Sequence, residues 1–446
     1  RVVLEGSRGL DLIDRWSSIA WSEFSGEARA ICDRREVDVI HHDLGAIVRP
    51  VSRGQEVTLA QVGLRAVEER TSLVWLVHGH TIRPASRNTP AITCVCMNME
   101  LGIYTFGDLA AGEDAATSLR HVLERARLAE EVGLDYVGIG EHHRAEYSIS
   151  SPATVISAAL AQTSRIHVGS AVTVLSTEDP VRVYQQFATM DAFSGGRVEL
   201  LAGRGSFIES YPLFGADLGD YDALYDEKIQ LLLTLDEAAV ADASITWSGK
   251  FRPELRDAVV LPRPADIPGR GRRLNLAVAT GGNPESSVRA AVLGLPINYA
   301  IIGGKPSHFA PLAGLYRQEF RARAGLEGAT PSVTLSGMGF VASDAREALD
   351  TFFPYWHTSM TAISRERGFA APNRITFEAT SGPDGAYAVG NPEQVAAKIV
   401  RTQKAVGHTR QIFQIDVGGV PHADQLRAIE LLGTQVKPLV DAELSL

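Results

Sequence analysis

Eight strand-like segments, each followed by helix-patterned sequence, recur between residues 101 and 417, and this alternation constrains the fold more than any other feature. Several segments are apolar on both faces, as strands of a buried parallel sheet must be. The strands are expected at 101–106, 135–140, 166–175, 197–202, 274–279, 296–302, 332–341 and 410–417. Helices after four of them begin with a capping residue and proline, at Ser151-Pro152, Asp179-Pro180, Asn283-Pro284 and Asn391-Pro392. Eight β/α units predict an α/β fold, a (β/α)8 TIM barrel, rather than an open doubly wound sheet.

Two segments are too long to be simple connections of such a barrel. The first, residues 206–273, follows the fourth strand and contains an expected helix over 221–235. It continues into a stretch rich in proline, glycine and arginine at 261–272, so we expect this insertion to be a mobile flap that covers the site. The second segment, residues 365–390, is expected to be a loop.

Residues 1–98 lack the regular alternation that begins after them. Two domains are therefore expected: an accessory or upstream segment at 1–98, of unknown fold with disorder as an alternative, and the barrel at 99–446. Met97 and Met99 directly precede the first strand, so we expect translation to start there. A helix is plausible over 57–70. The histidine pairs His41-His42 and His78/His80 lack carboxylate or cysteine partners at ligand spacing, and no metal site is expected.

Composition excludes several classes of function. The 446 residues carry 53 acidic and 43 basic side chains, a net charge of −10, which argues against a nucleic-acid partner or an anionic membrane surface. No apolar run approaches the roughly 20 residues needed to span a bilayer, and no secretory signal is recognised. Three cysteines are too few for a disulfide framework. We expect a cytoplasmic protein with a small-molecule substrate.

Two histidines follow the second expected strand, where residues 140–144 read Gly-Glu-His-His-Arg. Barrel enzymes place their chemistry on the loops after the strands, at the end of the barrel that we call the mouth. A neutral imidazole there can act as a general base or donate a hydrogen bond to a flavin ring or a peroxide oxygen. His142 and His143 are therefore candidate catalytic residues. A packing role is an equal alternative from position alone, and a metal site is less favoured than either.

Two further loops suit an anion. Arg204, Gly205 and Ser206 follow the fourth strand and combine a permanent cation, a small residue and a hydroxyl. Residues 280–286, Thr-Gly-Gly-Asn-Pro-Glu-Ser, lead from the fifth strand into a helix whose free N–H groups favour a negative charge. A surface arginine and an ordinary capped turn are the simpler alternatives for each loop. Together on adjacent strands, they favour a phosphate-bearing cofactor.

These motifs together resemble the bacterial luciferase-like flavin monooxygenase family, and the likeness covers residues 99–438. It depends on the order of Glu141-His142-His143, the strand at 168–175, Ser194-Gly195-Gly196-Arg197, residues 203–207, Pro262-Arg263-Pro264, the turn at 281–286 and residues 416–421. Members of this family are flavin-dependent barrels, so the resemblance implies that FMN is bound in reduced form. It also implies a separate NAD(P)H-dependent flavin reductase, reaction with O₂ and, in many relatives, a homodimer.

The resemblance also implies roles for individual residues. His142 matches the catalytic histidine of the family and His143 its neighbour, whereas Ala171-Val172 matches a peptide bond that is cis in relatives and lies beneath the flavin ring. The cofactor-binding positions are Ala171, Val172, Arg204, Gly205, Ser206, Gly281, Gly282, Asn283 and Ser286. Luciferase has an acidic residue where this chain has Gly282, so light emission is not expected.

The expected activity is therefore a flavin-dependent monooxygenase that oxidises a small organic substrate with reduced FMN and O₂. One alternative keeps the barrel but uses a deazaflavin for hydride transfer without oxygen. Another is a flavin-binding protein that has no catalytic turnover. The sequence does not identify the substrate, because a barrel pocket is lined by residues from distant loops.

Overall fold

The computed structural model describes residues 99–323 and 331–445, together with six strands upstream of them. The contacts divide the chain into two compact units at the boundary between Asn98 and Met99. In the upstream unit an antiparallel sheet has the order β1-β4-β5-β6, and β2 and β3 form a separate hairpin. These strands are Val2–Val3 (β1), Val37–His42 (β2), Gly45–Pro50 (β3), Val74–Val77 (β4), His80–Ser86 (β5) and Thr89–Val95 (β6). The helix expected over 57–70 lies outside the described residues.

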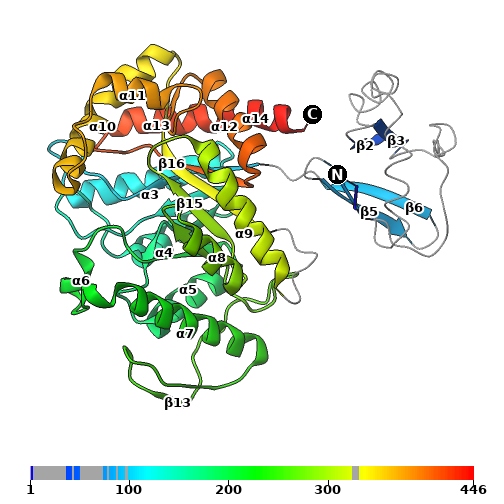
Figure 1. Ribbon diagram of the computed structural model, residues 1–446, viewed down its shortest axis with the longest axis vertical. Coiled ribbons are helices and arrows are strands. Elements are labelled where there is room, and N and C mark those ends of the chain that lie inside the picture. Colours follow the sequence, from blue (N-terminus) through cyan, green and yellow to red (C-terminus); the bar gives the residue numbers. More distant parts are fainter. Residues whose placement is uncertain are drawn as a thin grey trace. The chain divides into compact units, whose positions relative to one another are not determined.

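The second unit is a closed barrel of parallel strands, which confirms the predicted fold (Figure 1). The strand order is β7-β8-β9/β10-β11-β14-β15-β16-β18, and β18 pairs with β7 to close the ring. The strands are Glu100–Thr105 (β7), Tyr136–Ile139 (β8), His167–Ser170 (β9), Thr173–Val174 (β10), Val198–Gly203 (β11), Leu276–Thr280 (β14), Ile297–Ile301 (β15), Val333–Val341 (β16) and Arg410–Gln414 (β18). Each lies inside or within one residue of its expected range, and the third is divided into two pieces.

Helices surround the strands (Figure 1). Buried apolar side chains fill the layer between the helices and the strands. The helices that follow the strands are Ala115–Glu131 (α3), Pro152–Gln162 (α4), Pro180–Ser194 (α5), Tyr221–Ala241 (α7), Pro284–Leu293 (α8), Ala310–Ala322 (α9), Pro392–Val406 (α12) and His422–Leu431 (α13). Asp179, Asn283 and Asn391 accept backbone N–H bonds at their helix starts, as predicted. Ser151 makes no such capping bond, because its hydroxyl pairs with Thr154.

The second long segment, expected to be a loop over 365–390, contains regular structure, so that prediction was wrong. Helix α10 (Ala345–Arg367) extends into it, and α11 (Arg374–Ser381) and strand β17 (Ala388–Gly390) follow. Strand β17 pairs with the end of β16, which is long enough to serve both the barrel and this extra pairing. Asn373 builds a capping box with Thr376 at the start of α11. Helix α14 (Lys437–Leu444) closes the chain.

The insertion after the fourth strand occupies both ends of the barrel. Its first part lies at the mouth and contains the short helix α6 (Ser210–Leu213). Helix α7 then runs along the outside of the barrel toward the other end, and at 1.5 Å per residue it is about 30 Å long. The strands β12 (Ile245–Trp247) and β13 (Leu255–Ala258) follow α7 in the chain and form an antiparallel hairpin.

The proline-rich stretch that follows the hairpin does not cover the mouth, so the prediction of a flap over 261–272 was wrong. Arg270 and the N–H of Ala265 bond to Asp191, in the last turn of α5. Arg273 bonds to Asp236. These buried carboxylates fix the stretch at the opposite end of the barrel, which we call the floor. No helix among the described residues has the length and apolarity to cross a membrane.

Candidate functional site

His142 lies in an aromatic pocket at the end of β8. Its ring centroid is 4.4 Å from those of Phe106 and Tyr147 and 4.9 Å from that of Phe207, and only 8% of the residue is exposed. Burial, together with the positive charges of Arg144 and His143, lowers the pKa of His142 to about 3. The imidazole is therefore neutral, and no hydrogen bond to its ring is found among the described residues. Its nitrogens are available to a ligand.

His143 has a different environment, although it is the next residue. Its Nε2 lies 3.0 Å from Oε1 of Glu141, and the other oxygen of Glu141 accepts the N–H of Val174 at 2.9 Å. The ring also contacts the edge of Phe214, at a centroid distance of 5.3 Å. The carboxylate therefore anchors His143 to the third strand. Of the two predicted catalytic histidines, only His142 faces the aromatic pocket.

The third strand is divided because β9 ends at Ser170 and β10 begins at Thr173. The peptide bond between Ala171 and Val172 is cis, as the resemblance implied. Neighbouring strands have glycine where this segment passes. A Cβ on Gly203 would lie 2.6 Å from Val172, and a Cβ on Gly138 would lie 2.8 Å from the Cβ of Ala171. Side chains at these positions would displace the segment.

Arg204 and Ser286 come together at the mouth, across the neighbouring strands β11 and β14. The guanidinium Nη2 lies 3.4 Å from the Oγ of Ser286, and Nη1 lies 2.5 Å from the carboxylate of Asp222, whose side chain is 67% exposed. The guanidinium also lies over the ring of Tyr221. Tyr221 donates its O–H to the carbonyl of Gly205, so the loop after β11 is held in place. We call Arg204 and Ser286 the cradle.

The glycine turn after β14 has fewer free N–H groups than its sequence indicates. The N–H of Ser286 bonds to the side chain of Asn283 at 2.7 Å, and the N–H of Gly282 bonds to Thr280 at 3.2 Å. These two amides already have acceptors, so the guanidinium and the Ser286 hydroxyl are the principal donors of the cradle. Gly282 has φ +96, and a Cβ there would lie 2.4 Å from the ring of Phe309. Gly281 precedes it with open space around its Cα.

A family model described as "Luciferase-like monooxygenase" matches residues 99–409, which is most of the chain. The chain belongs to this family. The match begins at the first residue of the barrel unit and covers His142, the cis peptide and the cradle. The family predicted from the ordered motifs is therefore confirmed, and the chain is a member of a family of monooxygenases.

One curated relative of this luciferase-like chain is the "Luciferase-like monooxygenase" of Escherichia coli (strain K12). It is 25% identical over 310 residues, which cover 67% of this chain and 83% of the relative. Among solved structures, monooxygenase RslO1 from Streptomyces bottropensis has a TM-score of 0.66 at 23% identity and covers 76% of this chain and 99% of its own.

Two other similar structures differ in their cofactors. The oxygenating constituent of 3,6-diketocamphane monooxygenase from Pseudomonas putida, in complex with FMN, has a TM-score of 0.57 at 18% identity, covering 76% of this chain and 98% of its own. An F420-dependent secondary alcohol dehydrogenase has a TM-score of 0.61 at 17% identity, covering 77% and 99%. The two likenesses show that these proteins and this luciferase-like chain share one fold.

The sequence analysis missed several residues of the luciferase-like site. Phe106, Tyr147 and Phe207 come from three loops, and no spacing in the sequence indicates that they surround one histidine. Asp222 was missed because it is the second residue of α7, and an exposed acid is common in the first turn of a helix. The one signal available was position, since Phe106 ends the first expected strand and Phe207 ends the motif at residues 203–207.

A cover over the mouth was also missed. The end of α10 reaches the loops after β8 and β11, where Arg144 forms two hydrogen bonds with Glu366, at 2.8 and 2.9 Å. Arg367 donates to the carbonyl of Ser206 at 2.8 Å. Both Arg144 and Arg367 also lie over the ring of Phe207. The end of α10, which lies in the segment that was expected to be a loop, is therefore held against two loops of the mouth in this luciferase-like barrel.

Proposed function

We propose that this chain is a flavin-dependent monooxygenase that uses reduced FMN and O₂ to oxidise a small organic substrate. The observation that carries the proposal is the cradle, in which a guanidinium and a hydroxyl converge at the mouth beside the loop of His142. Phe207 follows Arg204 by three residues and packs against the ring of His142, so the two parts of the site are in contact. Membership of a monooxygenase family supports the same activity.

The residues present fit FMN. Arg204 and Ser286 offer a cation and a donor for a phosphate, close to the start of α8, whose dipole favours an anion. Gly138 and Gly203 of the neighbouring strands make room for the segment at Ala171 and Val172, which matches the segment beneath the flavin ring in the family. When bound, FMN would supply the redox chemistry with O₂. The FMN complex of the Pseudomonas putida relative supports this choice.

The remaining work falls to side chains of the chain itself. His142 is neutral and can accept a proton from the substrate or donate a hydrogen bond to a reacting oxygen. Phe106, Tyr147 and Phe207 exclude water from its surroundings, and the end of α10 covers this region. Glu141 and His143 fix the loop that carries His142. Reduced FMN would come from a separate NAD(P)H-dependent reductase, as the resemblance to the family implies.

Binding and oxygen uptake of the full chain test this proposal together. FMN and F420 are titrated by fluorescence, and oxygen uptake is then measured with reduced FMN over a panel of small organic compounds. The expected result is FMN binding with uptake that one class of compounds increases. Binding of F420 alone, with hydride transfer and no oxygen uptake, would replace the proposal by the deazaflavin alternative. Tight FMN binding without turnover would indicate a flavin-binding protein that has no catalytic activity.

A further inference from the structure

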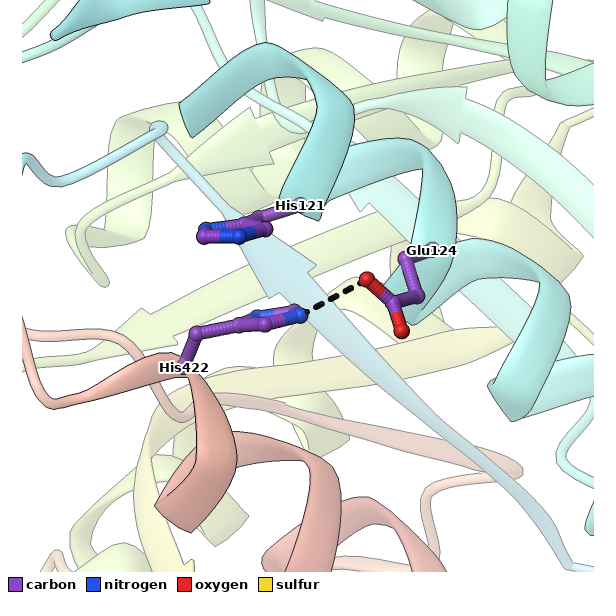
Figure 2. Close-up of side chains that lie close together, drawn as sticks. All are labelled: His121, Glu124 and His422. Carbon is purple, nitrogen blue, oxygen red and sulfur yellow. Dashed lines mark hydrogen bonds and ion pairs between the residues drawn. The ribbon is translucent and has the colours of Figure 1, made fainter. Parts of the chain in front are cut away.

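A second group of polar side chains lies outside the site described above, between helices α3 and α13 (Figure 2). It consists of His121 and Glu124 on α3 and of His422, the first residue of α13. One ligand atom from each residue lies within 4.8 Å of the others. The strands that precede these helices, β7 and β18, are the first and last of the barrel and pair side by side. The group therefore bridges the seam where the barrel closes.

The backbone holds these side chains on one face. His121 and Glu124 are three residues apart on α3, and side chains with that spacing lie next to each other along a helix. His422 projects from the start of α13 toward them, and Figure 2 shows its ring below that of His121 and beside the carboxylate of Glu124. All three are thus carried by regular helices rather than by loops.

The contacts within the group leave nitrogen atoms unused. Nε2 of His422 lies 2.9 Å from Oε2 of Glu124, and the two imidazole rings stack with centroids 3.7 Å apart and an interplanar angle of 6°. Nδ1 of His422 is buried and has no hydrogen-bond partner in the described part of the chain. Because the carboxylate of Glu124 lies at Nε2, an ion shared by Glu124 and His422 would bind Nε2 in place of the present hydrogen bond.

A fourth residue supports His121 from its other side. Oε1 of Glu113 lies 2.6 Å from Nδ1 of His121, and the side chain of Glu113 is 13% exposed. Metal-bound histidines commonly donate their second ring N–H to a carboxylate in this way, which fixes the ring and strengthens it as a ligand. Nδ1 of His121 is thus occupied, and its Nε2 is the nitrogen left for another partner.

The charges of the group favour a cation from outside over two protonated rings. Two imidazolium ions stacked face to face would repel each other. Neutral imidazoles together with the carboxylates of Glu113 and Glu124 form a net negative site that a divalent ion would neutralise.

We propose that His121, Glu124 and His422 bind a divalent transition-metal ion of the Zn²⁺ class and so fasten the first β/α unit of the barrel to the last. Two imidazoles and one carboxylate are ligands typical of Zn²⁺, whereas Mg²⁺ and Ca²⁺ prefer oxygen alone. Ligand atoms around a tetrahedral Zn²⁺ with bonds of about 2.0–2.1 Å lie roughly 3.3 Å apart, so binding requires the two stacked rings to turn out of their parallel arrangement. A water molecule would complete the coordination.

Zinc titration of the full chain tests this inference, using protein first stripped with EDTA and then given Zn²⁺ alone. Affinity is measured by competition with a chromogenic chelator, and Co²⁺ reports the coordination by its visible absorption. The expected result is one site that is lost, at least about 100-fold, in His422→Ala and weakened about 10–100-fold in Glu113→Gln. At a hundredfold excess over Kd, Zn²⁺ should raise the Tm by roughly 5 °C.

The controls separate this site from other histidines. His308 is exposed and remote from the seam, so His308→Ala should keep the wild-type affinity and the wild-type rise in Tm. If histidines of residues 1–98 also bind zinc, they do so equally in every variant, so their contribution cancels when the variants are compared. Glu124→Gln keeps the size of the side chain, and circular dichroism shows whether it folds. Equal zinc affinity in wild type, Glu124→Gln and His422→Ala, or no change in Tm with Zn²⁺, would overturn the inference.

Discussion

The two ends of the barrel use the same residue types for different purposes. At the floor, Arg410 bonds to Glu199 at 2.5 and 2.9 Å and to Glu100 at 2.6 Å. Burial alone would raise the pKa of Glu199, but Arg410 and His167 outweigh it and lower that pKa to about 2. At the mouth, Arg204 has one strongly exposed carboxylate, Asp222, and a long contact to a hydroxyl.

The histidines at the two ends differ in the same way. His408, which precedes β18 at the floor, is fully buried and bonds to Gln411 at 3.0 Å. His142 at the mouth is almost as buried, but aromatic rings surround it and no partner is found among the described residues. Arg410 and Glu199 at the floor are therefore paired within the protein, and His408 uses one ring nitrogen while its Nδ1 has no partner among the described residues; mouth groups keep capacity for a ligand. This division is what barrel enzymes lead one to expect, with stability at one end and function at the other.

The sharpest test compares the two histidines. His142→Ala should lower substrate-dependent oxygen uptake by about 10²–10⁴-fold, because it removes the acid-base group of the mouth. His408→Ala should leave uptake per folded molecule unchanged. Rates are measured with reduced FMN and the compound that most stimulates uptake, at matched folded fractions. Equal rates in wild type and His142→Ala would contradict the role of His142 in the reaction.

The next test moves to the floor. Arg410→Ala should destabilise the protein by about 3–5 kcal/mol, since it leaves the buried carboxylate of Glu199 without its main partner. FMN affinity should change little in the fraction that stays folded. Urea unfolding followed by circular dichroism measures the first effect and fluorescence titration the second. A stability loss below 1 kcal/mol would contradict the view that the floor is built for stability.

The corresponding change at the mouth should have the opposite pattern. Arg204→Ala should weaken FMN binding by about 10–100-fold, which corresponds to the 1.5–3 kcal/mol of a hydrogen bond to a charged group. Its stability should stay within about 1 kcal/mol of wild type, because its ion pair is exposed. Arg346→Ala, which removes an exposed arginine far from the mouth, is the matched control. An unchanged FMN affinity in Arg204→Ala would end the phosphate assignment.

Acid should weaken both ends through their histidines. The pKa values of His142 and His408 are each about 3 in the folded chain and about 6.5 when it is unfolded. Between those values only the unfolded chain takes up the protons, so stability falls as pH decreases from about 6.5 toward 3. The slope is at most about 1.4 kcal/mol per pH unit for each histidine. His408→Gln should flatten the curve, as measured by Tm against pH, and an unchanged slope would contradict the assignment.

The smallest expected effect is a gain. Asp222→Asn removes the carboxylate that competes for Arg204, so FMN should bind about 2–5-fold more tightly, in line with the 0.2–1 kcal/mol of an exposed ion pair. Asp226→Asn, one turn further along α7 and paired with Arg289, serves as the control. Fluorescence titration at two salt concentrations measures both. Weaker binding in Asp222→Asn would mean that Asp222 positions Arg204 instead of restraining it.

How far the sequence predicts this molecule depends on the range of each interaction. The eight barrel strands were predictable because buried parallel strands are apolar on both faces, and the caps at Asp179 and Asn283 are local bonds. Strand β17 was missed because three residues show no periodicity. The position of 261–273 was missed because it depends on Asp191, more than 70 residues away.

The candidate site shows the same limit. Arg204 and Ser286 were predictable as a pair because they follow adjacent strands, whereas the rings around His142 come from separate loops. The histidine and glutamate at 121 and 124 show a helical spacing, but their partner His422 is 298 residues from Glu124. Only the closed barrel, which brings the first and last units together, makes that group visible.

The ion pair between Arg144 and Glu366 joins the cover to the mouth, and one of its partners is 45% exposed. Attraction between exposed charges weakens as the Debye length shortens, from about 10 Å at 0.1 M salt to about 3 Å at 1 M. Ligands should therefore enter and leave this barrel faster in concentrated salt than in dilute salt. Replacement of Glu366 alone should then lengthen or shorten the time for which a ligand stays bound, while Arg144 keeps its second partner, Glu209.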